Sequence, residues 1–294
     1  MPGNSGLDGL DFRKSSVSRF VSRANATLAV HHSTMVRVPL HVHEFGPADG
    51  VPLLALHGVS GHGGRWRILA RTRLAGFRII APDLRGHGHS IPLPPWTLEQ
   101  HAADLLAVID AYDLDAVPVL AHSFGAAVAL QLARLAPGRL SRLLLLDPAV
   151  GINPTLALER ASVPARVFAD PRQAYQAQRY DWPAASEEAI TEEVAEHLEQ
   201  TDAGWRFRYQ PPSVATAWSE MARTPVLPGP GTPTLLVRAL REQYVTPALI
   251  TGCQLALGPD FELVDMDCGH MIYLELPDET GELITRFVES GLTG

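Results

Sequence analysis

Short apolar runs alternate with longer segments of helical period from about residue 36 onward. This alternation is typical of βαβ units, which build a mostly parallel sheet with helices on both faces. Helices are expected over Thr97–Tyr112, over Phe124–Leu135, where Pro137-Gly138 is a stop signal, and from about Pro277. The pattern therefore predicts an α/β fold. Its predicted strands are Val36–His43, Val51–His57, Phe77–Pro82, Val117–Ala121, Leu140–Leu146, Thr234–Arg238 and Phe261–Met266.

The alternation stops after Asp147, and residues 151–230 contain no run that predicts a strand. Tryptophans and acidic segments of helical period, such as Ser186–Glu199, predict a helical lid inserted over 151–230. The core then consists of residues 35–150 and 231–294. Residues 1–34 are rich in Ser, Gly and Arg without a clear period, which predicts a poorly ordered N-terminal extension.

Composition and charge limit the kinds of binding partner that we expect for this chain. The chain has 294 residues, 46% of them hydrophobic, enough to bury the core of one large domain or of one domain with an insertion. A net charge of −8 gives no footprint for nucleic acid, and no apolar run approaches the roughly 20 residues of a membrane span. The two cysteines, Cys253 and Cys268, predict reduced thiols in a cytoplasmic protein. A small-molecule partner is expected, and nothing indicates an oligomeric state.

The strongest chemical signal is the segment Val117–Ala127, in which a strand turns abruptly into an Ala-rich helix with Ser123 at the corner. It matches the nucleophile elbow G-x-S-x-G, with Ala121 in place of the first glycine, His122 before the serine and Gly125 as the last small residue. Small neighbours allow so tight a turn. The alternative is a serine that caps an ordinary helix.

A second turn follows the predicted strand Val51–His57, where His57 and Gly58 precede Val59. A backbone N–H in such a turn can point at the oxygen of an attacked carbonyl, so the Val59 and Phe124 amides are candidates for an oxyanion hole. His57 could be taken for a catalytic base, but support of this loop is the preferred interpretation.

From about Leu40 to Phe287 the sequence resembles the α/β-hydrolase superfamily, in particular its capped esterases, lipases and C–C hydrolases. The resemblance includes residues 83–90, which match the family's D-x-R-G-x-G-x-S loop. That loop is structural in the family, so His87 and His89 are expected to be loop residues. They lack a third ligand at metal-binding spacing, and neither a metal nor a cofactor is predicted.

The resemblance also implies the partners of Ser123. His270, which follows the last predicted strand, stands where the family carries its catalytic base. The acid is expected after the penultimate strand, where Glu242 is found, with Ala239 for the usual glycine and Glu for the usual Asp. Asp147 is the alternative, because some members place the acid there; otherwise it caps a loop before Pro148. We favour Glu242, although the order Ser, acid, His fits both.

These residues predict a serine hydrolase that cleaves the carboxylic ester of a small, apolar substrate through an acyl-enzyme. C–C bond hydrolysis, lactone opening and perhydrolysis use the same groups and stay open. Another alternative is a slow-turnover ligand receptor of the same fold. A serine at the elbow argues against the related epoxide hydrolases and haloalkane dehalogenases, which carry aspartate there.

Overall fold

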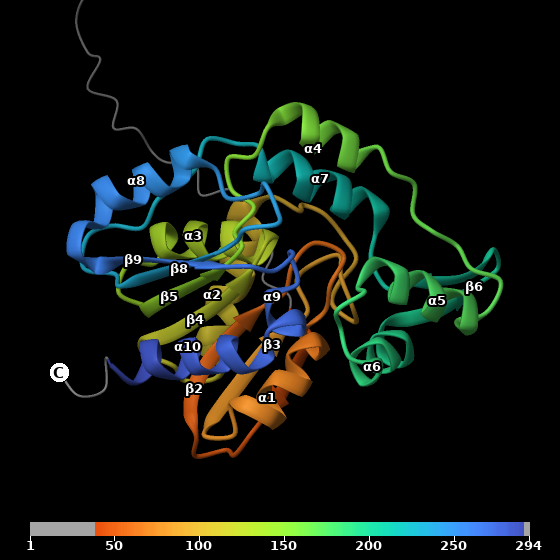
Figure 1. Ribbon diagram of the computed structural model, residues 1–294, viewed down its shortest axis with the longest axis horizontal. Coiled ribbons are helices and arrows are strands. Elements are labelled where there is room, and N and C mark those ends of the chain that lie inside the picture. Colours follow the sequence, from red (N-terminus) through yellow and green to blue (C-terminus); the bar gives the residue numbers. More distant parts are fainter. Residues whose placement is uncertain (1–38, 291–294) are drawn as a thin grey trace, which may run out of the picture. The chain divides into compact units, whose positions relative to one another are not determined.

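The computed structural model describes residues 39–290. Within them the chain forms a seven-stranded sheet in the order β1-β3-β2-β4-β5-β8-β9. Only β1 is antiparallel to its neighbour (Figure 1). The predicted α/β fold is thereby confirmed. The strands are β1 (Val42–Phe45), β2 (Val51–Leu56), β3 (Phe77–Pro82), β4 (Val117–His122), β5 (Leu140–Leu146), β8 (Thr234–Ala239) and β9 (Phe261–Met266).

The central strands are buried on both faces, which is why they read as continuous apolar runs rather than as alternating patterns. Six strands agree with their predicted bounds to within one residue. The first strand begins at Val42 rather than at Val36, and residues 36–38 of that prediction lie outside the described residues. The predicted extension 1–34 also lies outside them.

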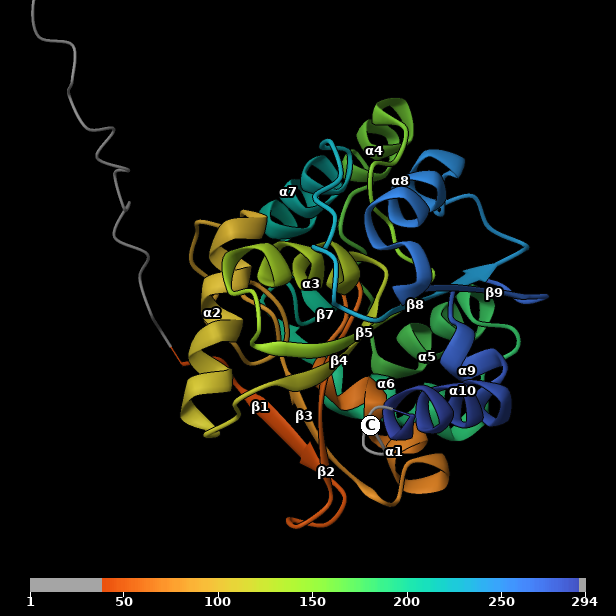
Figure 2. The same cartoon turned by 90° about the vertical axis from the view of Figure 1, so that its left-hand side faces the viewer.

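Helices cover both faces of the sheet (Figure 2). The helices α2, α3 and α8 pack in one apolar cluster, and α1, α9 and α10 pack in the other. The Thr97 side chain caps α2 by accepting a hydrogen bond from the Gln100 amide. No helix in residues 39–290 is long and apolar enough to cross a membrane. The helices are η1 (Gly63–Trp66), α1 (Arg67–Arg73), α2 (Leu98–Ala111), α3 (Phe124–Leu135), α8 (Pro247–Leu257), η2 (Gly258–Asp260), α9 (Ile272–Glu275) and α10 (Pro277–Glu289).

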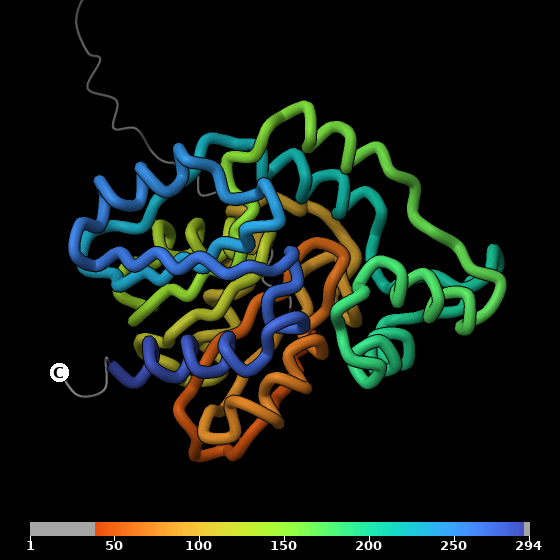
Figure 3. The backbone as a smooth tube through the Cα atoms, viewed as in Figure 1, coloured from red at the N-terminus to blue at the C-terminus, as the bar shows by residue number. Residues whose placement is uncertain are grey.

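The segment between β5 and β8 leaves the sheet and returns to it, as the green and teal trace in Figure 3 shows. The expectation that it holds no strand is wrong, because β6 and β7 form an antiparallel hairpin. Each strand has only four residues, and polar side chains such as Glu199 and Gln200 interrupt its apolar pattern. The elements of this segment are α4 (Pro154–Ala161), α5 (Pro171–Asp181), α6 (Glu187–His197), β6 (Leu198–Thr201), β7 (Gly204–Phe207) and α7 (Pro211–Met221).

Candidate active site

Ser123 occupies the sharp turn between β4 and α3. Its backbone has φ 54° and ψ −117°, a conformation that a side-chain-bearing residue rarely adopts. A Cβ atom on Gly125 would lie 2.7 Å from the His57 carbonyl oxygen, so the close approach of α3 to β2 requires glycine there. The Ser123 side chain makes no capping hydrogen bond to α3. The geometry is therefore that of a nucleophile elbow and not of an ordinary helix cap.

A chain of hydrogen bonds leads from Ser123 through His270 to Asp147. The Ser123 hydroxyl lies 2.9 Å from Nε2 of His270, and Nδ1 of the same ring lies 2.6 Å from Oδ2 of Asp147. The other carboxylate oxygen of Asp147 accepts a hydrogen bond from the Ala239 amide at 3.1 Å. The three side chains follow β4, β5 and β9, whose carboxyl ends meet at one edge of the parallel sheet. This arrangement can move a proton away from the serine hydroxyl.

The preference for Glu242 over Asp147 is wrong, because Asp147 is the carboxylate that forms the hydrogen bond to the His270 ring. Strands β5 and β8 are neighbours, so both candidates lie at the same sheet edge. Asp147 directly follows β5, and its amide donates to the Val237 carbonyl on β8, which fixes its side chain beneath His270. Glu242 lies three residues beyond the end of β8 and is half-buried. Burial and the nearby charge of Asp147 raise the pKa of Glu242, while the His270 backbone amide opposes that rise.

The pKa values of Asp147 and His270 are shifted in opposite directions. Burial raises the pKa of Asp147 to about 6, although the Ala239 amide acts against this rise. Burial lowers the pKa of His270 to about 3, and the positive charge of Arg160 adds to the effect. At neutral pH the carboxylate is therefore ionised and the imidazole is neutral, the state that can accept the serine proton.

His57 holds the loop after β2 in place rather than facing Ser123. Its Nε2 accepts a hydrogen bond from the Leu84 amide at 2.9 Å, and Nδ1–H donates to the Gly58 carbonyl at 2.7 Å. Because a trans peptide points its N–H and C=O in opposite directions, this bond turns the Val59 amide away from His57. The Phe124 amide is the first of α3 and lacks an intrahelical acceptor. Both amides therefore stay candidates for an oxyanion hole.

His122 and Gly58 both lie next to Ser123 and help to shape the site. His122 is buried, and its Nε2–H donates to the backbone carbonyl of His270 at 2.8 Å, which anchors the His270 loop. Burial lowers the pKa of His122 to about 3, so it stays neutral. A Cβ atom on Gly58 would lie 2.9 Å from the His122 ring and 3.1 Å from Cβ of Ser123. Glycine at this position thus lets the loop approach the elbow.

A buried ion pair ties the loop at residues 83–90 to helix α2. Arg85 donates to both oxygens of Asp104 at 2.7 Å, and both side chains are buried. Nδ1 of His87 lies 3.1 Å from the Arg85 carbonyl oxygen, and burial lowers the pKa of His87 to about 4. His87 therefore serves this loop, as expected. Neither His87 nor His89 lines the cavity beside Ser123.

Ser123 and His270 open into a cavity of about 220 Å³. The sequence did not single out most of its lining, because aromatic residues in a segment without motifs give no positional signal. Tyr244 had a positional signal, since it stands two residues after Glu242 in the loop where the acid is expected. Most of the aromatic and charged lining comes from the segment between β5 and β8: Arg166, Asp181, Trp182, Phe207, Tyr209 and Trp218.

Comparison with known proteins agrees with this geometry. Residues 51–277 match the family model described as alpha/beta hydrolase fold. The chain belongs to this family, and it is a hydrolase of the α/β type. It is 38% identical over 253 residues to "Lipase LipV" of Mycobacterium tuberculosis (strain ATCC 25618 / H37Rv), covering 84% of this chain and 97% of that protein.

Two solved structures show the same fold at lower identity. The crystal structure of E-2-(acetamidomethylene)succinate hydrolase gives a TM-score of 0.72 at 22% identity, covering 85% of this chain and 95% of that one. A "Marine microorganism esterase" gives 0.66 at 20% identity, covering 85% and 99%. At these identities the likeness supports the fold alone.

Proposed function

We propose that this chain is a serine hydrolase that cleaves a carboxylic ester through an acyl-enzyme, with Ser123 as nucleophile, His270 as base and Asp147 as acid. The observation that carries the proposal is the hydrogen-bonded chain from Asp147 through His270 to Ser123, which ends in a cavity. The similarity to a lipase over nearly the whole of that protein also supports ester hydrolysis.

In the first half of the reaction, Oγ of Ser123 attacks the ester carbonyl while its proton passes to Nε2 of His270. The carbonyl oxygen becomes an anion that the Val59 and Phe124 amides receive. Asp147 stabilises the imidazolium and fixes its tautomer. When the tetrahedral intermediate collapses, the bond to the alkoxide breaks and His270 returns the proton to the leaving group.

In the second half, a water molecule takes the place of the alcohol. His270 removes one of its protons as the water oxygen attacks the acyl carbonyl, and the same amides receive the oxyanion. Collapse breaks the bond to Oγ of Ser123, and the proton on Nε2 returns to the serine. The products are a carboxylic acid and the free enzyme.

We further propose that residues 151–230 act as a lid that selects the substrate. Trp182, Phe207 and Trp218 of this segment line the cavity, which favours an apolar acyl or alkyl group on that side. Arg166 and Asp181 of the same segment add charged groups to the wall. The volume of about 220 Å³ lies below the ~300–1,000 Å³ usual for drug-sized ligands, so a short group is preferred. Long acyl chains would require movement of this segment.

A panel of p-nitrophenyl esters of increasing acyl length, run beside a lactone and a vinylogous diketone, tests the proposal. We expect many turnovers per chain on short esters, a decline with chain length, and no activity in Ser123→Ala. Turnover of the lactone or the diketone alone would replace ester hydrolysis with one of those reactions. A single turnover followed by a stable adduct would instead support a ligand receptor.

A further inference from the structure

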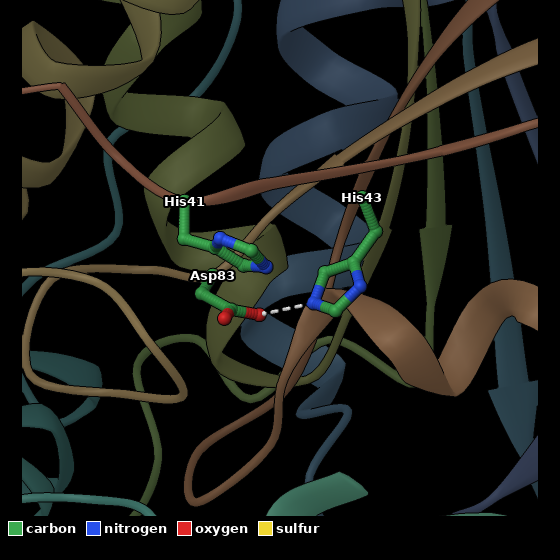
Figure 4. Close-up of side chains that lie close together, drawn as sticks. All are labelled: His41, His43 and Asp83. Carbon is green, nitrogen blue, oxygen red and sulfur yellow. Dashed lines mark hydrogen bonds and ion pairs between the residues drawn. The ribbon is translucent and has the colours of Figure 1, made fainter.

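A second group of side chains lies at the β1 edge of the sheet, apart from the cavity beside Ser123. His41 and His43 are two residues apart at the start of β1, so both side chains lie on one face of the strand. Asp83 follows β3, and its amide donates to the His41 carbonyl at 2.8 Å. Figure 4 shows the two rings and the carboxylate turned toward one another. None of the three lines the Ser123 cavity.

Asp83 carries a buried negative charge. Oδ1 accepts a hydrogen bond from the Gly63 amide at 2.7 Å and faces Nε2 of His43 at 3.1 Å. Oδ2 accepts from the His89 amide at 2.8 Å. Every neighbour in these contacts can donate, which favours the ionised carboxylate, and the residue has no exposed surface.

Hydrogen-bond donors rather than a permanent cation balance this charge. Within residues 39–290 the ion-pair partner of Asp83 is His43, which is charged only when its ring is protonated. A divalent cation beside the carboxylate would supply a fixed positive charge at this place. The position next to two imidazoles suits a cation that nitrogen and oxygen can ligate together.

One of the three spacings already suits a small tetrahedral ion. One donor atom from each of the three residues lies within 4.8 Å of the other two. At zinc bond lengths of about 2.0–2.2 Å, neighbouring ligands of a tetrahedral ion stand about 3.3 Å apart. His43 and Asp83 already have this separation, at 3.1 Å. His41 is exposed and has room to move closer.

We propose that His41, His43 and Asp83 bind a zinc-like divalent cation, with water in the fourth position. Two imidazole nitrogens and one carboxylate oxygen form a donor set that suits zinc. Nε2 of His43 must carry no proton to bind the ion, so the single proton of the neutral ring then stands on Nδ1. The ion would join β1 to the loop after β3. Asp83 in that loop also accepts a hydrogen bond from the Gly63 amide, so the start of η1 would be held at the same place. The role of the ion is therefore stabilisation rather than chemistry at Ser123.

The test is titration of the chelator-treated full-length protein with Zn²⁺ by calorimetry. We expect one equivalent bound and a melting temperature that rises with Zn²⁺ concentration. Co²⁺ should give the intense visible absorption of a tetrahedral site. His41→Ala should weaken binding by at least about tenfold without unfolding the protein, because His41 is exposed.

The matched control is the double variant His31→Ala/His32→Ala, which removes the adjacent histidine pair outside the described residues. It should keep the affinity and the cobalt spectrum. Retained affinity in both His41→Ala and His43→Ala, lost affinity in the control, or no binding at millimolar Zn²⁺ would overturn the proposal. All these readouts are independent of ester turnover, so failure here leaves the proposed function untouched.

Discussion

Ser123 is held in a backbone conformation that costs on the order of 1–3 kcal/mol for a residue with a side chain. Gly58 and Gly125 leave room for this conformation, because they let the loop after β2 and the helix α3 approach the turn. The conformation places the hydroxyl 2.9 Å from His270. At the scale of single residues, the strained backbone of Ser123 thus depends on the absence of side chains at Gly58 and Gly125.

The first prediction concerns the two carboxylates. Asp147→Asn should lower kcat by up to about 10⁴, because the amide cannot hold the imidazole in its working tautomer or stabilise the imidazolium. Glu242→Gln should stay within about tenfold of the parent, since Asp147 keeps its bond to His270. Steady-state kinetics on a short ester, with melting curves to check the fold, measure both. A dead Glu242→Gln and an active Asp147→Asn would return the acid to Glu242.

The second prediction concerns pH. The working state needs an ionised Asp147 and a neutral His270, whose pKa values are about 6 and about 3. Because these groups share a hydrogen bond, they titrate as a pair, and uptake of the first proton removes the working state. We expect kcat/KM to be constant near neutral pH and to fall as the pH is lowered through about 6. Glu242→Gln should keep this acid limb, moved slightly to lower pH because its repulsion with Asp147 is lost. Loss of the limb in Glu242→Gln would contradict the assignment.

The choice of the acid could not be predicted correctly from the sequence. Ser123 was singled out by a local pattern, the tight turn after β4, whereas His270 was expected from the family resemblance, in the Gly-His loop after β9. Asp147 and Glu242 follow strands that are separated by the whole inserted segment in sequence but are neighbours in the sheet. Chain order is the same for both, so only the side-chain geometry distinguishes them.

At the scale of elements, an ion-pair row joins α6 to η1 and α1. Glu193 forms two hydrogen bonds to Arg65, at 2.6 and 2.9 Å, and both side chains are nearly buried. Arg65 also donates to the Ser60 carbonyl at 3.2 Å, next to the proposed oxyanion loop. The other pairs of the row are more exposed: Glu196 with Arg67 and Glu188 with Arg71. The inserted segment is therefore tied to the loop that supplies the Val59 amide.

The third prediction follows from the burial of this pair. Glu193→Gln should lower the free energy of unfolding by about 3–5 kcal/mol, because it leaves the Arg65 charge buried without its partner. Glu188→Gln is the matched control on the same helix, and its exposed pair should give no measurable change. Urea denaturation compares the two variants. Equal stability of both would show that the row does not hold α6 in place.

Elements were predictable where one physical pattern dominated. The buried strands β3 and β5 have the expected bounds, because apolar runs between turn signals leave little choice. The more exposed edge strand β9 also has its expected bounds. The hairpin of β6 and β7 was missed, since Leu198 continues directly from α6 and its strand carries Glu199 and Gln200. Its cross-strand pairing of Leu198 with Phe207 exists only once the tertiary structure has formed.

At the scale of the molecule, the chain divides into Met1–Met35 and Val36–Gly294. The fourth prediction is that deletion of residues 1–34 changes neither kcat nor the melting temperature. The sequence of this segment has no periodic apolar face that could contribute to a core. Thermal melts and ester kinetics of the shortened chain measure this. A shortened chain that fails to fold would show that the segment contributes to stability.

The proposed reaction depends on Ser123 forming the covalent intermediate. Its most direct test is labelling of the full-length protein with a fluorophosphonate, followed by peptide mapping of the adduct. We expect one adduct per chain, located on Ser123, with labelling strongly slowed in His270→Ala and absent in Ser123→Ala. An adduct on another serine, or full ester turnover in Ser123→Ala, would contradict it.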